Sequence, residues 1–172
     1  MCATALSAAG CGSGGQAQNE PLPRAPERLK LMTTAFPDGG TIPRDFTCDG
    51  GGSPPPLSAA GVPDTARELA LFVDDPDAPG GDFSHWIVYG IPARDGPLLV
   101  KEGHEGRNSL GRVGWAPPCP PDGDAPHHYV FVLYALSKPS GLEEGDSVDE
   151  AIAAVKPAVT ARGTLTGRYG RR

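Results

Sequence analysis

The sequence contains no long hydrophobic run, no surplus of basic residues and no internal repeat. A membrane-spanning helix needs ~20 apolar residues, and no run approaches that length, so the chain is not expected to span a membrane. The formal net charge of −6 argues against nucleic acid or an anionic membrane surface as a general partner. The 172 residues are enough for one domain with a hydrophobic core.

Two catalytic signatures are also missing. The sequence has no H-E-x-x-H pair, which would indicate a zinc-binding helix, and no G-x-S-x-G turn, which would indicate a serine hydrolase. We therefore expect no catalytic residues, no metal and no cofactor. Four residues do include the ligand types of a metal site, which keeps a metal-dependent hydrolase as the least favoured alternative: Asp75, Asp77, His85 and His127.

Glycine and proline, by contrast, are abundant. The chain has 24 glycines and 20 prolines, with 38% hydrophobic and 21% charged residues. This composition is typical of a soluble protein, and it favours many turns and short strands over long helices.

The most informative stretch is residues 68–92. Residues 69–73 form a short apolar run that predicts a strand buried on both faces. Two prolines and two glycines then predict a rigid loop over residues 74–82, and a second strand follows over residues 83–91. Alternation would place its side chains on two faces, with His85, Ile87, Tyr89 and Ile91 on one and Trp86, Val88 and Gly90 on the other.

If these two strands are neighbours, the loop brings Asp74, Asp75 and Asp77 beside His85. Carboxylates and an imidazole at the mouth of a rigid sheet are consistent with a small-ligand site. The same residues also fit a purely structural role, because aspartates often cap turn amides and a histidine at a strand start is often part of the core. The pattern alone leaves both interpretations open.

Further elements are predicted along the rest of the chain. Residues 127–136 form a strong strand pattern, with His127, Tyr129 and Phe131 on one face. The helix expected over residues 147–155 has Ser147 and Glu150 at capping-box spacing. Additional strands or extended segments are expected over residues 29–36, 41–48 and 161–169.

The first residues indicate export. Ala8-Ala9-Gly10-Cys11 resembles the end of a bacterial lipoprotein signal peptide, with Cys11 as the lipidated residue. Residues 1–11 would then be the end of the signal, residues 12–27 a flexible tether and residues 28–172 the folded domain. On this interpretation the protein is anchored at the outer face of a bacterial membrane. The alternative is a disordered leader on a cytoplasmic protein.

Two separated motifs together resemble a known family. The first is D-P-D-A-P from Asp75, followed by H-W-I-V-Y-G-I-P from His85; the second is P-C-P-P from Pro118, followed by H-x-Y-V-F-x-L-Y-A-L from His127. Both resemble signatures of the phosphatidylethanolamine-binding proteins, and the nearest branch is that of the bacterial Raf-kinase-inhibitor-like proteins. The segment G-R-N-S-L-G-R-V-G-W from Gly106 resembles that branch too.

The resemblance implies a fold and a site. The expected fold is mainly β, an antiparallel Greek-key sandwich with few short helices. The expected pocket binds small anions or phospholipid head groups without catalysis, and its residues are Asp75, His85, Pro121, His127 and Tyr129. Some family members instead inhibit a protease or a kinase, so an unidentified protein target is the alternative. Where the family usually has arginine, this chain has His128, which puts a supporting salt bridge in doubt.

The resemblance also places the loops of Cys48 and Cys119 near one end of the sheets. An oxidising compartment would permit a disulfide between them. Two separate thiols are the alternative, because sequence does not give the geometry that a disulfide requires.

Overall fold

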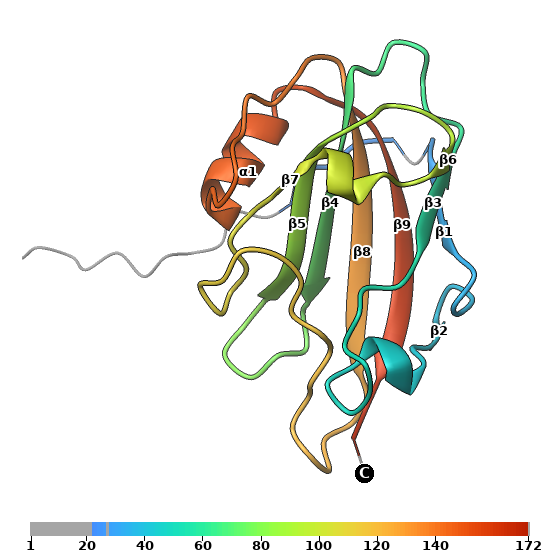
Figure 1. Ribbon diagram of the computed structural model, residues 1–172, viewed down its shortest axis with the longest axis vertical. Helices are drawn as coiled ribbons and strands as arrows, with labels where there is room; N and C mark the ends of the chain where they lie inside the picture. Colours follow the sequence, from blue (N-terminus) through green and yellow to red (C-terminus); the bar gives the residue numbers. More distant parts are fainter. Residues whose placement is uncertain (1–21, 27, 172) are drawn as a thin grey trace, which may run out of the picture.

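The computed structural model describes residues 22–26 and 28–171, which form two packed β-sheets and one α-helix (Figure 1). The strands are β1 (Lys30–Thr33), β2 (Gly40–Thr41), β3 (Leu57–Ala60), β4 (Glu68–Asp75), β5 (Phe83–Ile91), β6 (Gly96–Pro97), β7 (His104–Glu105), β8 (His127–Leu136) and β9 (Val159–Tyr169). The helix is α1 (Val148–Val155), and two short 3-10 turns are η1 (Arg44–Phe46) and η2 (Val100–Glu102). The expected mainly-β architecture is confirmed.

One sheet has six strands in the order β2-β9-β8-β4-β5-β7, and the other has three in the order β1-β3-β6. The described pairs are antiparallel, except that the two residues of β2 run parallel to β9. Long strands at the centre, β4 and β8, are rich in aliphatic and aromatic residues, which suit a sheet covered on both faces.

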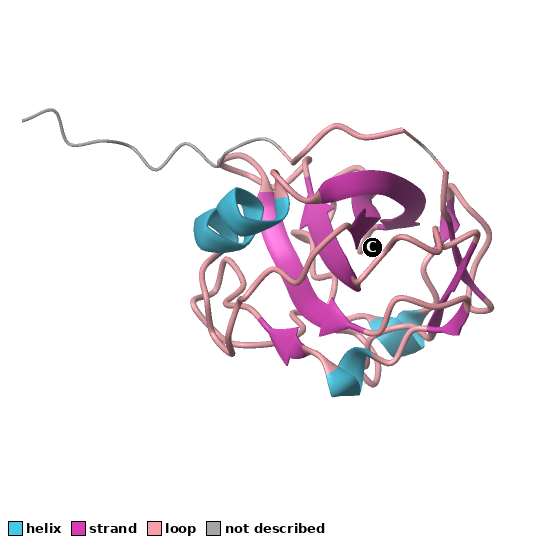
Figure 2. Cartoon of the chain, turned by 90° about the horizontal axis from the view of Figure 1, so that it is seen from above, coloured by secondary structure: helices cyan, strands magenta, loops and turns pink. Residues whose placement is uncertain are grey.

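The six-stranded sheet is covered on both faces (Figure 2). Between the two sheets lies a core that includes Leu71, Val73, Phe131 and Leu133. On the opposite face, Phe72 and Tyr134 pack with α1. The alternation of β8 follows the predicted pattern, since Tyr129 and Phe131 face one core while Val132 and Tyr134 face the other.

The helix α1 begins where its capping box predicts. Ser147 Oγ accepts a hydrogen bond from the backbone N–H of Glu150 at 3.3 Å, and Glu150 Oε2 accepts one from the N–H of Ser147 at 2.9 Å. Each bond satisfies an amide that has no partner inside the helix, which is typically worth ~1 kcal/mol. The buried face of the helix, Ala151, Ile152 and Val155, packs on the sheet.

Two predicted strands are shorter than expected. The strand expected over residues 29–36 ends at Thr33, because Thr33 Oγ1 accepts from the N–H of Ala35 at 3.2 Å and bends the chain. The segment expected over residues 41–48 is the two-residue β2 followed by η1. Pro43 has no N–H for a sheet, and its carbonyl instead accepts from the N–H of Phe46 at 3.0 Å.

The strand β4 is longer than predicted. The sequence interpretation ended it at residue 73 and assigned Asp74 and Asp75 to the loop, but both residues are in the strand. They pair with Ser84 and Phe83, so the ladder with β5 continues past the apolar run. Because the strand continues, Asp75 lies on the face of Val73 and Asp74 on the opposite face.

The predicted faces of β5 are wrong at two positions, because the strand contains two irregularities. Val73 pairs with Trp86 and Asp74 with Ser84, which leaves His85 as an extra residue. A bulge of this kind turns the side chain of its extra residue away from the face that strict alternation predicts. The centroid of the His85 ring lies 5.1 Å from that of Tyr129, so His85 is on the side of the inter-sheet core.

The second irregularity is near Gly90. Leu69 pairs with Ile91 and Leu71 with Val88, so β5 again has one residue too many for strict pairing. Gly90 has a φ of +71°, a conformation that glycine adopts without strain. Ile91 therefore packs in the inter-sheet core with Val88, not on the face of Ile87.

Residues 22–26, which the sequence interpretation included in the tether, lie against the domain. Leu22 packs beside the core under α1. The carbonyl of Pro23 accepts from the buried Tyr134 hydroxyl at 2.9 Å, and that of Pro26 accepts from the N–H of Arg162 at 3.0 Å. Cys11 and residues 12–21 lie outside the described residues. In the described part, no helix has both the length and the apolar character to cross a membrane.

Candidate functional site

A cavity of about 440 Å³ lies where β4, β5 and β8 meet the loops at one end of the six-stranded sheet. All five residues expected from the sequence line it: Asp75, His85, Pro121, His127 and Tyr129. The remaining lining residues are Cys48, Ala78, Pro79, Phe83, Leu110, Ala116, Pro117, Cys119 and Pro120. The volume is within the range of small-molecule sites.

Asp75 and His127 form a buried pair in the lining of the cavity. His127 Nδ1 lies 2.7 Å from Asp75 Oδ2, and both side chains are almost fully buried. The other carboxylate oxygen, Oδ1, accepts from the backbone N–H of Asp77 at 2.9 Å, so the loop after β4 holds the carboxylate in place. An ionised carboxylate only accepts, so the hydrogen is on Nδ1 of His127 and Nε2 is left for a ligand.

His85 is held by the loop that follows Trp115. Its Nδ1 donates to the carbonyl of Ala116 at 2.7 Å, and the N–H of Ala116 donates back to the His85 carbonyl at 2.9 Å. The ring packs between Phe83 and Tyr129, with centroid distances of 4.7 and 5.1 Å. Burial lowers the pKa of His85, and the bond to Ala116 and the charge of Asp75 only partly offset this effect.

Tyr129 places a hydroxyl beside these two histidines. Its side chain is buried, and its Oη is a buried polar atom without a hydrogen-bond partner among the described residues. Burial, followed by the negative charge of Asp75, raises the pKa of Tyr129, so the phenol keeps its hydrogen. An unpartnered buried donor costs folding free energy, so this hydroxyl needs an explanation beyond packing.

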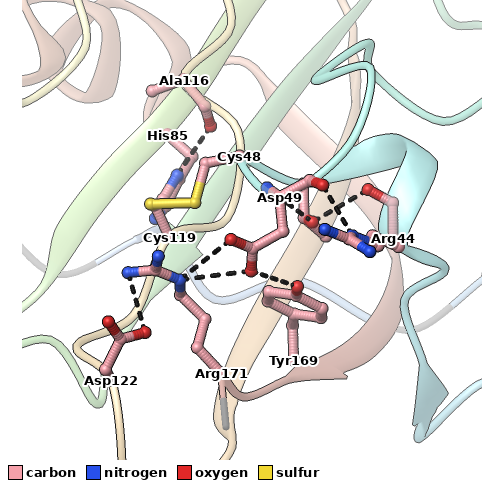
Figure 3. Close-up of a disulfide and its surroundings, with 10 residues drawn as sticks. Arg44, Cys48, Asp49, His85, Ala116, Cys119, Asp122, Tyr169 and Arg171 are labelled. Carbon is pink, nitrogen blue, oxygen red and sulfur yellow. Dashed lines mark hydrogen bonds and ion pairs between the residues drawn. A yellow bond between two sulfur atoms is a disulfide. The ribbon is translucent and has the colours of Figure 1, made fainter.

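One wall of the cavity is a proline-rich loop, residues 116–121, which is cross-linked to the loop after η1. Cys48 and Cys119 form a disulfide with a Cα–Cα distance of 5.4 Å, the first of the two alternatives that the sequence left open (Figure 3). The N–H of Cys48 also donates to the carbonyl of Pro118 at 3.1 Å. Since prolines cannot donate to a sheet, these links define the wall.

An ionic bridge reinforces the same two loops (Figure 3). Arg171 lies between Asp49, with Nε 3.2 Å from Oδ2, and Asp122, with a guanidinium nitrogen 3.1 Å from Oδ1. Asp49 also accepts from the Tyr169 hydroxyl at 2.6 Å, and this hydrogen bond is the main cause of the lowered pKa of Asp49. The C-terminal residues thus brace the pocket wall.

The loop after β4 is supported by His128, at the position where the family usually has arginine. Asp77 Oδ2 accepts from both Nδ1 and the backbone N–H of His128, at 2.7 and 2.8 Å. The hydrogen bond from His128 is the main reason that the pKa of Asp77 is lowered. Position 128 therefore does support a neighbouring loop in this chain, through an imidazole.

The glycine-rich segment over residues 106–115 contributes Leu110 to the cavity lining. Buried Asn108 organises it: Oδ1 accepts from the N–H groups of Leu110 and Arg112, and Nδ2 donates to the carbonyl of Gly114. Gly111 and Gly114 have φ angles of 73° and 96°, which favour glycine. The turn presents Leu110, which is 56% exposed and lines the cavity.

Asp74 is not part of the cavity. It faces away from Asp75 and accepts from the Ser84 hydroxyl at 2.6 Å. Burial raises the pKa of Asp74 to about 6, although the bond from Ser84 lowers it. The sequence interpretation had placed Asp74, Asp75 and Asp77 together beside His85, and the structure brings only Asp75 to the cavity lining.

Several cavity residues were not expected from the sequence. The Ala116 carbonyl, which sets the orientation of His85, is a backbone group, so no residue type in the sequence could have indicated it. Phe83 was predicted only to be part of a strand. Leu110 belongs to the glycine-rich segment that the resemblance covered, so that segment was the one available indication.

The cavity contains few charges. Among the described residues, no lysine or arginine lines it, and its polar side chains are one carboxylate, two imidazoles and one phenol. Within the described residues, no group of three or more His, Cys, Asp and Glu side chains could hold a metal ion. The arrangement can donate and accept hydrogen bonds with a small polar group, and the prolines, Phe83 and Leu110 offer apolar contacts beside it.

The fold and the site together define a class: a β-sandwich protein with a small Asp-His-Tyr pocket at one end of the central sheet. A family model described as phosphatidylethanolamine-binding protein matches residues 32–170. The chain belongs to this family.

Three relatives illustrate the match. An archaeal protein named "UPF0098 protein", from Methanothermobacter thermautotrophicus, is 40% identical over 152 residues and covers 83% of this chain and 99% of its own length. The candidate lipoprotein LppC of Mycobacterium tuberculosis is 37% identical over 185 residues, with 97% and 92% covered. A crystal structure of CT736, a candidate phosphatidylethanolamine-binding protein homologue from Chlamydia trachomatis, has a TM-score of 0.76 at 35% identity and covers 85% of this chain and 99% of its own.

Proposed function

We propose that this protein is a non-catalytic binding protein for a small oxyanion, either free or as the head group of a phospholipid such as phosphatidylethanolamine. Membership of the phosphatidylethanolamine-binding protein family supports this proposal. So does the cavity, because its histidine Nε2 atoms and its phenol are the groups left for a ligand. Because the described lining residues include no lysine or arginine, the affinity for a small anion should be modest.

The observation that carries the proposal is the Tyr129 hydroxyl. A buried donor without a partner costs about 1–3 kcal/mol, and function is a common reason to retain such a cost. Tyr129→Phe removes only the hydroxyl. It should leave the protein as stable as wild type or more stable by about 1 kcal/mol, and it should weaken ligand binding about tenfold.

Calorimetric titration tests the proposal with three ligands: inorganic phosphate, phosphoethanolamine, and vesicles of phosphatidylethanolamine in phosphatidylcholine. Binding of the vesicles alone would identify the intact lipid as the ligand, and binding of phosphate alone would identify the free anion. Binding that is the same for Tyr129→Phe and wild type, or no binding of any of the three, would overturn the proposal. Chemical unfolding of the same variants provides the stability comparison.

We also propose that the mature protein is exported and lipid-anchored through Cys11. The disulfide suits an oxidising compartment, and the similar LppC protein is described as a candidate lipoprotein. Intact mass of protein expressed from the complete reading frame is the test. A mature chain that begins at Cys11 with a diacylglyceryl-sized increment is expected, and retention of the preceding residues without that increment would contradict the anchor.

A further inference from the structure

The tautomer of His85 determines what the cavity can bind. Its Nδ1 lies 2.7 Å from the Ala116 carbonyl oxygen, and a carbonyl oxygen only accepts, so the hydrogen is on Nδ1. In the neutral ring, Nε2 is then a lone-pair acceptor. The N–H of Ala116 also donates to the His85 backbone carbonyl at 2.9 Å, which holds the Ala116 carbonyl beside the ring, so a flip of the ring would lose the Nδ1 hydrogen bond.

The surroundings keep this ring neutral near pH 7. The charged and titratable groups near it are Asp75, which favours the imidazolium, and His127, which opposes it; Tyr129 is uncharged. Burial is the largest influence and lowers the pKa of His85. The other neighbours are the aromatic rings of Phe83 and Trp115. His85 therefore acts as an acceptor toward a ligand.

Tyr129 is the complementary donor. Its hydroxyl has no partner in the described part of the chain, and its ring contacts that of His85 edge to face. His127 Nε2 is the third polar atom left toward the cavity, since Nδ1 is paired with Asp75. A ligand that fits this set must offer at least one hydrogen to an acceptor and one oxygen to a donor.

We propose that the cavity binds a tetrahedral oxyanion in a form that carries one hydrogen, a phosphate monoester or phosphonate monoanion, and rejects the corresponding sulfate. The P–OH group donates to Nε2 of His85, and the Tyr129 hydroxyl donates to an unprotonated oxygen. A sulfate ester carries no hydrogen near neutral pH, so one of its oxygens would place lone pairs against the lone pair of Nε2. This inference rests on the proposed function and names the ligand class of the same site.

The pH dependence follows from the ligand as well as from the protein. A phosphate monoester has a second pKa near ~6, so the monoanion is the main species below that pH and a minor one above it. The apparent affinity follows the fraction of the competent form. Between pH 7.5 and pH 6.5, this fraction and the affinity for phosphoethanolamine should rise about eightfold.

The experiment compares two ligands that differ only in the oxyanion: phosphoethanolamine and ethanolamine O-sulfate. Each is titrated calorimetrically into the full chain at pH 5.5, 6.5 and 7.5. At pH 6.5, where a pKa below 6.5 keeps His85 mostly neutral, phosphoethanolamine should bind at least about tenfold more tightly than the sulfate, because opposing two lone pairs in a buried site costs more than about 1 kcal/mol. Inorganic phosphate and inorganic sulfate in the same series distinguish recognition of the oxyanion itself from recognition of the ethanolamine ester.

Two variants show whether His85 sets this preference. In His85→Gln, the side-chain amide can donate toward the cavity, so the preference for phosphate over sulfate should fall to about threefold or less. In His85→Asn, the amide can still donate to the Ala116 carbonyl, while Nε2 is lost, and the preference should fall in the same way. His104→Gln, at an exposed histidine outside the cavity, should keep the wild-type ratio.

The outcomes separate this inference from the proposed function. If phosphoethanolamine and the sulfate bind wild type with equal affinity at pH 6.5, the site binds oxyanions but does not select for a hydrogen, and the inference is wrong. An unchanged preference in both His85 variants would also overturn it. Failure of every ligand to bind at any pH would overturn the proposed function together with the inference.

Discussion

The two ends of β4 each bury a carboxylate, and the two carboxylates have different partners. Glu68, at the first residue, accepts from the N–H groups of Gly90 and Ser140 and from the Ser140 hydroxyl, at 2.6–2.9 Å. Asp75, at the last residue, accepts from the N–H of Asp77 and contacts Nδ1 of His127. Both are close to fully buried.

The two carboxylates differ in whether their partner also reaches the cavity. All donors to Glu68 are uncharged groups within the fold that do not line the cavity, so the effect of Glu68 is structural. At Asp75 one partner is an imidazole whose other nitrogen is left toward the cavity. A buried carboxylate that orients a histidine at a cavity can influence a ligand, while a carboxylate that only accepts from the backbone and a hydroxyl supports the chain.

Each end also contains one irregularity of β5. The N–H of Gly90, at the irregularity near Glu68, is satisfied by Glu68 itself. The irregularity at His85 is held by the Ala116 loop, and it turns the ring toward Tyr129. The same kind of strand irregularity therefore has a structural role at the Glu68 end of the sheet and orients a cavity residue at the Asp75 end.

The largest effect is expected at the pocket end, from loss of the disulfide. Cys48 and Cys119 are separated by 71 positions, and closing a loop of that size should stabilise the protein by about 4 kcal/mol. The double substitution Cys48→Ser with Cys119→Ser should therefore lower the free energy of unfolding by about that amount in urea titrations. Chemical reduction of wild type should reproduce the loss, and equal stability of the two forms would show that the ionic bridge through Arg171 suffices.

At the Glu68 end, Glu68→Ala should lower the free energy of unfolding by about 3 kcal/mol, because it removes a buried carboxylate that accepts three hydrogen bonds. Glu68→Gln keeps the shape and part of the bonding, so its loss should be smaller. Phosphoethanolamine affinity should be unchanged in folded protein for both variants. A clear loss of affinity would show that Glu68 influences the cavity at the other end of β4, and that its role is not purely structural.

Asp74, next to Asp75 but on the other face, should make stability depend on pH. Its pKa is raised from 3.8 to about 6, mainly by burial. Between these values the folded state binds the proton more tightly than the unfolded state, so the free energy of unfolding falls as the pH rises from 4 to 6. The contribution should be about 2 kcal/mol.

Asp74→Asn tests this prediction. The amide can still accept from Ser84 but does not titrate, so the difference in stability between variant and wild type should shift by about 2 kcal/mol in favour of the variant between pH 4 and pH 6.5. Urea midpoints at several pH values are the measurement. Parallel pH profiles for the two proteins would mean that Asp74 is solvated in the folded state.

Asp75→Asn should weaken binding of phosphoethanolamine about tenfold, which corresponds to ~1.4 kcal/mol. The amide cannot accept from both the N–H of Asp77 and Nδ1 of His127, so the imidazole loses its fixed orientation. Calorimetry gives the affinity, and urea unfolding should show a loss of only about 1 kcal/mol. Unchanged affinity would assign Asp75 the same structural role as Glu68.

The smallest effect is expected for His128→Ala. The pair with Asp77 is about 40% exposed on each side, with side-chain values of 41% and 43%. Exposed pairs contribute little, so the loss of stability should be about 0.5 kcal/mol. His128→Arg, the usual family residue, should restore it. A loss above ~2 kcal/mol would show that the loop after β4 depends on this pair more than its exposure indicates.

The sequence by itself determined the local features and much of the site. Alternation and apolar runs gave the length of β5 and the two faces of β8, and the capping residues gave the start of α1, because these features depend on neighbours a few positions away. The family motifs identified Asp75, His85, Pro121, His127 and Tyr129, which share one cavity. No ligand contact follows from either source, and binding stays a proposal.

Only the tertiary structure decided how these residues are oriented. The extra residue at His85 depends on how β4 and β5 register, and a register shift leaves no mark in the pattern of either strand. The contacts that orient the site join His85 with Ala116, Asp75 with His127 and Cys48 with Cys119, which are 31, 52 and 71 positions apart. Contacts over such separations form only when the whole sheet is assembled, and one of them is made by a backbone carbonyl that every residue type possesses.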